Sequence, residues 1–418
     1  MGDEYPEWLR KAKRRAREFI DRLPPPKYGA PLNLEDILSE DEELSTVESI
    51  DDMPPEAKKA YLSLSLHEVK SSAVAIQVDA RAWYEEYVKS IIPKGVEIMN
   101  TDEAVRRYDW LKDYWFKAFP MTLNRLTAIH AAYSRGGAFI HVAEGVKVRD
   151  PIQSCFIVAS SRYAQLPHSI VIAEPNSEIH IISGCTAPSM VGGSLHAGLT
   201  EVYVKRGAKV VSTMIEMWSR ETHSRPLKAV IVEDGGEYIE NFVVLDPGKS
   251  IQAYPTVILR GVSSSTVMRT ISIGSRDADV DIGEAAYLFG KGSRARLINR
   301  AVAMDTSVVR QRTKAWSKAS GTSAFLECSG VIIGDKAVIE TYPTLKADVK
   351  DTELYHESAV GKFSKNQLIY LMSKGFSEDE AVALLIRGFL DPKILNLPKP
   401  IEIQVSRIVD LIIKRGIG

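Results

Sequence analysis

The chain contains very little cysteine. Its 418 residues include only Cys155, Cys185 and Cys328, and no two of these form a Cys-x-x-Cys pair. An odd and widely spaced set argues against a disulfide framework. Three thiolates also cannot supply the four ligands of a permanent four-thiolate cluster within one chain. We therefore expect a reducing, cytoplasmic setting, in which each cysteine is either a small buried side chain or a soft metal ligand.

Long apolar runs and an excess of one charge are also missing. No run of roughly 18 uncharged apolar residues is present, so we expect no membrane span. The first residues, Met-Gly-Asp-Glu, lack the basic-then-apolar pattern of a secretion signal. The formal net charge of −1 gives no overall field that would attract nucleic acid or a membrane. A His-Glu-x-x-His motif, a phosphate-binding glycine loop and a serine nucleophile elbow are absent as well.

The first 134 residues are expected to form a helical region. Apolar residues recur at helical spacing from Trp8 to Leu23, and three prolines at 24–26 end that helix. The basic run from Arg10 to Arg17 is interpreted as its solvent face rather than as a nucleic-acid site. Residues from about 30 to 58 are acidic and lack periodic apolar positions, which predicts a flexible segment. A second helix is expected over 102–119, with Thr101 as its N-cap.

Residues 135–354 read as a long series of short β-strands. Apolar and polar residues alternate there, and small Gly- or Asn-centred turns recur. The strand cores expected are 138–142, 169–172, 178–182, 201–204, 209–212, 229–232, 257–259, 270–273 and 330–333. Repetition of one strand-and-turn unit favours a parallel β-solenoid. The irregular period leaves a two-sheet antiparallel sandwich open on strand patterning alone.

From about residue 355 to 418 the pattern changes to helix. The segment 365–373 is apolar at helical spacing, and Gly375 suits a C-cap. Ser377 and Glu380 form a capping box for the next helix, and 401–413 predicts a last amphipathic helix. Such a helical cap closes one end of a solenoid and can also present a docking face.

The cysteines raise the question of a metal. Cys155, beside a run of apolar residues, is interpreted as a buried hydrophobic side chain. Cys185 lies between a strand and a turn, and both a structural and a functional role stay open there. Cys328, together with His356 and Glu357, gives a thiolate, an imidazole and a carboxylate, a mixed set able to hold iron loosely. The alternative for His356 and Glu357 is a solvated pair that opens a helix.

An acidic strand offers a rival function. Asp277, Asp279, Asp281 and Glu284 are carboxylates of the kind that a β-helix carbohydrate-active enzyme uses in an open groove. We interpret them instead as a solvent-facing edge.

Short segments in a fixed order resemble one known family, the SufB/SufD scaffold proteins of the SUF iron–sulfur cluster assembly system. The resemblance covers about residue 95 to the C-terminus and is carried by their shared order. The matching segments include 137–142 (Gly-Ala-Phe-Ile-His-Val), 184–188 (Gly-Cys-Thr-Ala-Pro), 195–197 (Leu-His-Ala), 258–261 (Ile-Leu-Arg-Gly), 333–336 (Ile-Gly-Asp-Lys), 367–370 (Gln-Leu-Ile-Tyr) and 375–378 (Gly-Phe-Ser-Glu).

The resemblance implies a right-handed parallel β-helix with helical terminal regions. It also implies an assembly scaffold rather than an enzyme, and a transient iron–sulfur cluster at an interface between two scaffold subunits. It places sulfur acceptance at Cys185 and Cys328, with sulfur from a donor such as a cysteine desulfurase, and iron at Cys328, His356 and Glu357. An ABC-type ATPase, SufC, would dock on the C-terminal helices. The docking residues implied are Gln367, Leu368, Tyr370, Phe376, Ser377 and Glu380.

This chain combines features that the resemblance divides between two subunits. SufB-type subunits carry the equivalents of Cys328 and Glu357, and SufD-type subunits that of His356, so we expect a homodimer. Other positions depart from the SufB pattern: Phe156 and its neighbours replace an Arg and an Asn, Glu216 replaces a Gln, and Glu340 replaces a His. A divergent or SufD-like role, or a purely structural adaptor for the ATPase, therefore stays open.

Overall fold

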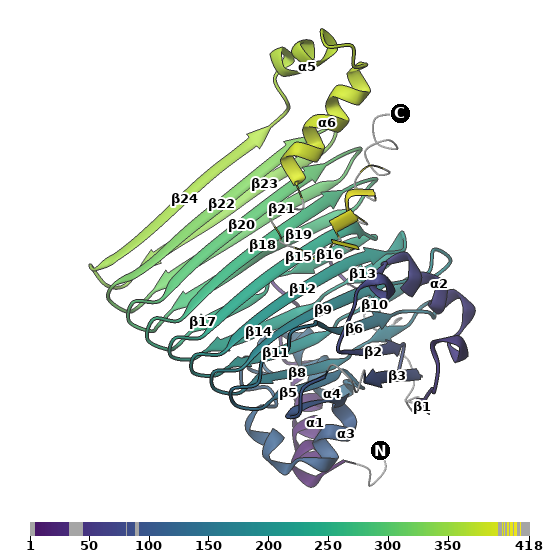
Figure 1. Ribbon diagram of the computed structural model, residues 1–418, viewed down its shortest axis with the longest axis vertical. Coiled ribbons are helices and arrows are strands. Elements are labelled where there is room, and N and C mark those ends of the chain that lie inside the picture. Colours follow the sequence, from purple (N-terminus) through teal and green to yellow (C-terminus); the bar gives the residue numbers. More distant parts are fainter. Residues whose placement is uncertain are drawn as a thin grey trace.

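The computed structural model describes residues 5–32, 45–80, 82–87 and 92–391, together with 395, 397, 399–400, 402–403, 405–407 and 410. Residues 33–44 of the acidic segment expected to be flexible, and part of the helix expected over 401–413, lie outside these residues. The described chain forms a β-solenoid of about eight turns, with helices gathered at its two ends (Figure 1). The predicted fold class is confirmed.

Two long sheets form the walls of the solenoid. The first runs in the order β1-β3-β2-β6-β9-β12-β15-β18-β20-β22-β24. Its strands are β1 (Ser45–Thr46), β2 (Ala73–Val78), β3 (Ala82–Tyr87), β6 (Ile152–Ile157), β9 (Glu178–Thr186), β12 (Lys209–Trp218), β15 (Glu237–Pro247), β18 (Ser265–Gly274), β20 (Arg294–Ala303), β22 (Thr322–Ile332) and β24 (Thr352–Gly361).

The second sheet runs in the order β4-β5-β8-β11-β14-β17-β19-β16-β13-β10-β7, and β21 and β23 continue it from β19. Its strands are β4 (Val96–Asn100), β5 (Ala138–Val142), β7 (Ala164–Gln165), β8 (His168–Ala173), β10 (Gly192–His196), β11 (Leu199–Val204), β13 (Glu221–Ser224), β14 (Leu227–Val232), β16 (Ser250–Ala253), β17 (Thr256–Leu259), β19 (Asp279–Leu288), β21 (Val308–Ser317) and β23 (Val338–Ala347). Successive coils pair in parallel, for example β12 with β15 and β19 with β21, which excludes the antiparallel sandwich.

The corners explain why the repeat is uneven in sequence. Residues at the predicted turns have positive φ, including Asn176 (60°), Gly207 (65°) and Gly235 (62°). The corners differ in length, so the number of residues per coil also differs. The hydrogen bond from Ser212 to Glu240 spans 28 residues, whereas the one from Thr352 to Thr322 spans 30. The side chains of each strand still alternate between the interior and the outside. The core is therefore regular although the sequence period is not.

Helices cover the N-terminal end. They are α1 (Glu7–Phe19), η1 (Ile50–Asp52), α2 (Pro55–Ser63), η2 (Leu66–Glu68), α3 (Thr101–Arg107), η3 (Asp109–Asp113) and α4 (Arg125–Tyr133). The expected helix over 102–119 is too long, because α3 ends at Arg107 and the segment that follows folds over the sheet. The buried carboxylate of Glu201 accepts hydrogen bonds there from the backbone N–H groups of residues 116, 117 and 118. The interpretation of the basic run of α1 as a solvent face fails at Lys13, which is buried and donates to the Ser134 carbonyl.

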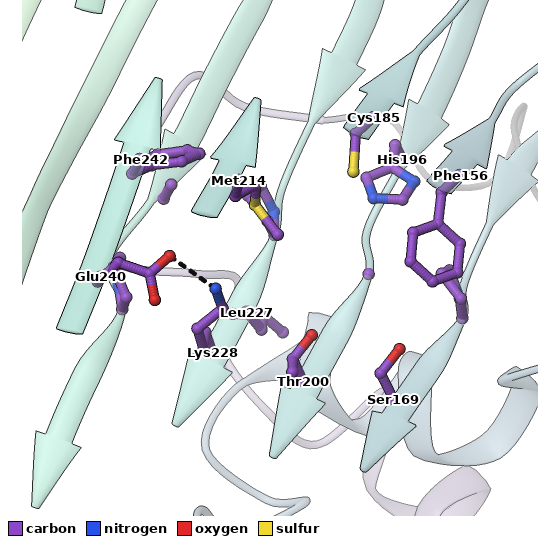
Figure 2. A pocket seen from close by; sticks show the side chains of 15 residues that line it. Phe156, Ser169, Cys185, His196, Thr200, Met214, Leu227, Lys228, Glu240 and Phe242 are labelled. Atoms are coloured by element: carbon purple, nitrogen blue, oxygen red, sulfur yellow. Dashed lines mark hydrogen bonds and ion pairs between the residues drawn. The ribbon is translucent and has the colours of Figure 1, made fainter. Parts of the chain in front are cut away.

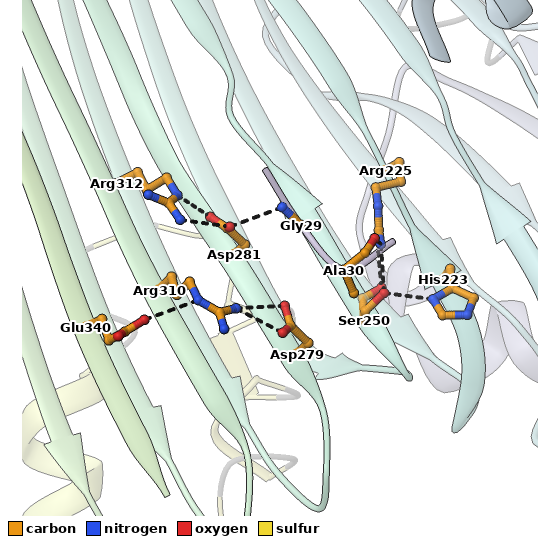
Figure 3. Close-up of polar contacts among 10 residues, drawn as sticks. All are labelled: Gly29, Ala30, His223, Arg225, Ser250, Asp279, Asp281, Arg310, Arg312 and Glu340. Atoms are coloured by element: carbon orange, nitrogen blue, oxygen red, sulfur yellow. Dashed lines mark hydrogen bonds and ion pairs between the residues drawn. The ribbon is translucent and has the colours of Figure 1, made fainter. Parts of the chain in front are cut away.

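A strap that includes Gly29 and Ala30 lies against the second sheet (Figure 3). The Gly29 N–H donates to Asp281 at 3.1 Å, and the Ala30 carbonyl accepts from the buried Arg225 at 2.9 Å. Gly29 has a φ of +85°, and a Cβ there would lie 2.6 Å from a side-chain carbon of Gln252, so only glycine fits. Asp281 is also paired with Arg312 at 2.6 Å. It therefore does not belong to a solvent-facing edge, which corrects its expected position.

The C-terminal end differs from the sequence-based expectation. β structure continues through β24 to Gly361, and the first helix, α5 (Lys365–Met372), begins ten residues later than the expected change near 355 (Figure 1). The next helix, α6 (Glu378–Leu390), has the predicted capping box of Ser377 and Glu380. β24 and β23 are the last strands of the two sheets, and most of their residues are exposed.

Candidate functional site

Cys328 lies inside the last full coil. In β22 it is aligned with Asn299 of β20 on one side and with Ser358 of β24 on the other. Residues aligned in neighbouring parallel strands point to the same face of the sheet. The Cys328 side chain is buried, and its Sγ lies 3.3 Å from Thr313 Oγ1 on the opposite wall. Burial raises the pKa of the Cys328 thiol to about 11, so the thiol is protonated at neutral pH.

His356 and Glu357 lie in β24, not at the start of a helix. His356 is aligned with the buried Leu326, so it shares the interior face with Cys328. Its Nε2 is buried without a hydrogen-bond partner, and burial lowers its pKa. Glu357 is aligned with Glu327 and faces the outside. The structure thus brings two of the three predicted iron ligands to one face and puts the third on the other. Over the described residues, no group of three His, Cys, Asp or Glu side chains could hold a metal ion.

Cys185 lines a narrow cavity near the N-terminal half of the solenoid (Figure 2). Its neighbours in register are Phe156 of β6 and Glu216 of β12. The cavity has a volume of about 30 Å³. It is lined by Phe156, Pro167, Ser169, Cys185, His196, Gly198, Thr200, Met214, Pro226, Leu227, Lys228, Glu240, Phe242, Ala253 and Pro255. Burial raises the pKa of the Cys185 thiol well above its ordinary value, and the nearby Glu216 adds to that shift.

The polar groups beside Cys185 mostly bind one another, but Glu216 Oε1 is buried without a hydrogen-bond partner. Lys228 forms a buried ion pair with Glu240 at 2.7 Å, drawn as the dashed line in Figure 2. Glu216 accepts hydrogen bonds from Trp218 Nε1 at 2.7 Å and from the Ser224 hydroxyl at 2.9 Å. Burial raises the pKa of Glu216 to about 7, although these bonds and Lys228 oppose the shift. Cys155, by contrast, is buried among apolar side chains, as predicted.

A second polar group inside the solenoid was not found by sequence reasoning. Glu284 of β19, expected on a solvent-facing edge, is completely buried. Neither of its carboxyl oxygens makes a hydrogen bond of good geometry, although Thr270 and Asn299 lie near it. Burial raises the pKa of Glu284 to about 8. Alternation along β19 was the available signal, because Glu284 has the parity of the apolar Val280 and Ile282.

The predicted docking residues lie on the α5–α6 hairpin, which projects from the end of the solenoid (Figure 1). No residue of α5 is buried, and Tyr370 is 62% exposed. Phe376 is also exposed. Gln367, Ser377 and Glu380 have structural tasks, since Gln367 caps α5 with Ser364 and the other two cap α6. The apolar residues are therefore the part of this set that is free to contact a partner.

Comparison with known proteins places the chain in a family. Residues 156–389 match the family described as SUF system FeS cluster assembly, SufBD core domain. An iron–sulfur cluster assembly SufBD family protein of Pyrococcus horikoshii is 35% identical, over 99% of this chain and 94% of that protein. A SufBD family protein of Methanothermobacter thermautotrophicus is 34% identical, over 93% of this chain and 95% of that protein. The SufB protein of Bacillus subtilis is 27% identical, over 99% of this chain and 91% of that protein.

In the part of the chain that the structure describes, none of the helices is long and apolar enough to cross a membrane. The parallel solenoid, the interior cysteines and the extent of these matches agree with one another. The chain belongs to the SufBD family of iron–sulfur cluster assembly proteins.

Proposed function

We propose that this chain is a scaffold subunit on which an iron–sulfur cluster is assembled transiently, together with an ABC-type ATPase of the SufC kind. Family membership carries the proposal. The position of Cys328 supports it, because this thiol lies one strand from the uncovered end of the solenoid. His356 on the same face adds an imidazole with an unpartnered nitrogen. Thiolate and imidazole are ligands that suit iron, and incomplete ligation favours release of the cluster over storage.

Sulfur acceptance is assigned to Cys185 first. Its thiolate would attack the outer sulfur of a persulfide on a donor such as a cysteine desulfurase. The donor's sulfur–sulfur bond breaks as the new bond to Cys185 forms, and the donor leaves as a thiolate, so no oxidant is needed. The cavity beside Cys185 provides space for the added sulfur atom. Cys328 would then receive the sulfur with the iron.

A second scaffold subunit is expected at the uncovered end. β23 and β24 are ten-residue edge strands, and exposed edges of this length pair readily with another chain. Tyr342, Tyr355 and Val360 add exposed apolar surface there. A twofold homodimer through these strands would bring Cys328 of one subunit toward His356 or Glu357 of the other. Mass spectrometry of the complex purified with its ATPase tests this, and an obligatory second type of scaffold chain would refute the homodimer.

The ATPase is expected on the exposed apolar side chains of α5 and α6, near Tyr370 and Phe376. Dimerisation of the ATPase on binding ATP would draw two such hairpins together. That movement would strain the paired edge strands and open them to iron and sulfur. An address in the cytoplasm, the absence of an activity of its own, and the absence of nucleic-acid or membrane partners remain predictions.

Anaerobic reconstitution with iron and sulfide tests the cluster assignment. Cys328→Ala should lose most of the cluster absorbance, because no other thiol lies on that face of the last coils in the described chain. Cys155→Ala is the matched control, since Cys155 is buried in an apolar cluster and should keep full absorbance. Full absorbance in Cys328→Ala would refute the assignment.

The adaptor alternative predicts a protein with neither iron nor sulfide when it is purified anaerobically with its ATPase. The carbohydrate-active alternative is not supported by the acidic strand. Asp281 is covered by the strap and paired with Arg312, and Glu284 is sealed inside the solenoid, so neither lines an open groove (Figure 3).

A further inference from the structure

The carboxyl groups inside the solenoid differ in what they contact. Glu240 is paired with Lys228, and Glu216 accepts from Trp218. Glu284 is equally buried, yet neither of its oxygens makes a hydrogen bond of good geometry, with Thr270 and Asn299 as its nearest polar neighbours. A buried carboxyl group without partners is costly, and such groups in native proteins call for an explanation such as a bound ion. Glu216 Oε1 is also buried without a partner, so among these three Glu284 is the one with two unpartnered oxygens.

Strand register puts Glu284 beside the Cys328 site. Glu284 is aligned with Thr313 of β21, and the Thr313 hydroxyl lies 3.3 Å from Cys328 Sγ. Asn299, which lies near the Glu284 carboxyl, is aligned with Cys328 on the other wall. The charge of Glu284 also contributes to the raised pKa of the Cys328 thiol. The two side chains therefore face one interior space from opposite walls.

The same space contains a second unpartnered oxygen. The amide nitrogen of Gln311 donates to Asn299 Oδ1 at 2.8 Å and to the backbone of residue 299. This arrangement leaves Gln311 Oε1 buried without a partner. A carboxylate, an amide oxygen and a thiolate form a mixed donor set, and such sets bind divalent transition metals such as iron(II).

Glu357, the carboxylate that the family resemblance pairs with Cys328, faces the outside of β24 in its own subunit. We propose that Glu284, rather than Glu357, is the carboxylate that coordinates a divalent iron ion held by Cys328 within one subunit, with Gln311 Oε1 beside it. This inference rests on the proposed function, in which Cys328 binds iron. A dication there also offsets the cost of burying two negative charges.

Anaerobic titration of the full-length protein with Co²⁺ alone tests this. A thiolate bound to Co²⁺ gives a sulfur-to-metal charge-transfer band, which reports the bond to Cys328 independently of cluster assembly. Glu284→Gln should weaken Co²⁺ binding by about tenfold or more, because a neutral amide replaces the carboxylate at nearly the same volume. Glu353→Gln, which changes an exposed carboxylate on the outer face of β24, is the matched control and should leave the affinity unchanged.

The outcomes separate the two ideas. Loss of the band in Cys328→Ser together with unchanged affinity in Glu284→Gln overturns the role of Glu284 and leaves the proposed function standing. A band that survives in Cys328→Ser overturns the assignment of Cys328, and with it this inference. Weaker binding in Glu357→Gln than in Glu284→Gln also overturns it.

If the melting temperature shows that Glu284→Gln does not fold, the same Co²⁺ titration is made with Glu284→Asp. This variant keeps the charge but shortens the reach, so it should bind Co²⁺ more weakly than the unchanged protein. Equal affinity in Glu284→Asp overturns the inference.

Discussion

Cys185 and Cys328 occupy the interior of one solenoid but have contrasting surroundings. The strands on both sides of Cys185 are themselves paired further along the sheet, and its polar neighbours bind one another except at Glu216 Oε1. Cys328 is one strand from the end of its sheet, and unpartnered atoms of Glu284, Gln311 and His356 lie in its coil or the adjacent ones. Both thiols are buried, so the two sites differ in position: the one around Cys185 lies within the sheet (the sealed end), and the one around Cys328 lies one strand from its edge (the open end). The sealed one suits protection of a reactive sulfur, and the open one suits exchange of iron.

The largest expected effect is on stability at the sealed end. Lys228→Met removes the cationic partner of Glu240. The Glu240 side chain is only 2% exposed. We expect a loss of about 3 kcal/mol of unfolding free energy at pH 7, because an unpaired buried carboxylate is left behind. Glu284→Gln at the open end breaks no ion pair, and its amide can still interact with Thr270 and Asn299, so its effect should stay within about 0.5 kcal/mol. Urea unfolding of both variants measures the contrast, and equal losses would contradict it.

The next effect concerns access to the thiols. Burial raises the thiol pKa at both sites, so alkylation requires local opening of the strands. Opening at the end of a sheet disrupts fewer strand pairs than opening within it. We expect Cys328 to react with iodoacetamide at least about tenfold faster than Cys185 in the native protein. Peptide mass spectrometry over time follows both sites in one sample, with Cys155 as the internal reference. Faster labelling of Cys185 would show that the sealed end opens first.

Much of the solenoid could be predicted from sequence. Its corners need residues that adopt positive φ, and the strands of its walls need alternating apolar and polar residues. Asn176, Gly207 and Gly235 mark such corners, and each has the expected backbone conformation. The last strand was missed, because residues 355–357 pack against no further coil and so carry no apolar alternation. Edge strands are the elements whose sequence is least constrained by burial.

The sequence predicted where the proposed thiol and imidazole ligands lie, but not where the carboxylates lie. Cys328 and His356 do share a face, as a common site requires. Glu284 and Asp281 were interpreted as exposed because acidic residues are seldom buried. The partner that buries Asp281, Arg312, lies 31 residues away in the next coil, and only three-dimensional register connects the two. Burial of a charge depends on such distant partners, which no local pattern contains.

The last expected effect is a pH dependence at the sealed end. Burial raises the pKa of Glu216 from 4.5 to about 7 in the folded protein. Between these values the folded state holds a proton that the unfolded chain has released. Stability therefore falls as the pH rises through this window, by at most about 1.4 kcal/mol per pH unit. Glu216→Gln has no proton to lose, so its stability relative to the unchanged protein should rise from pH 5 to pH 7 and then level off. The contribution of Glu201, whose folded pKa is also about 7, is the same in both proteins and cancels. Urea unfolding at pH 5, 6, 7 and 8 gives the difference in unfolding free energy between the two proteins. A difference that does not change with pH would mean that Glu216 is ionised in the folded protein. Cys185 would then lie beside a permanent negative charge.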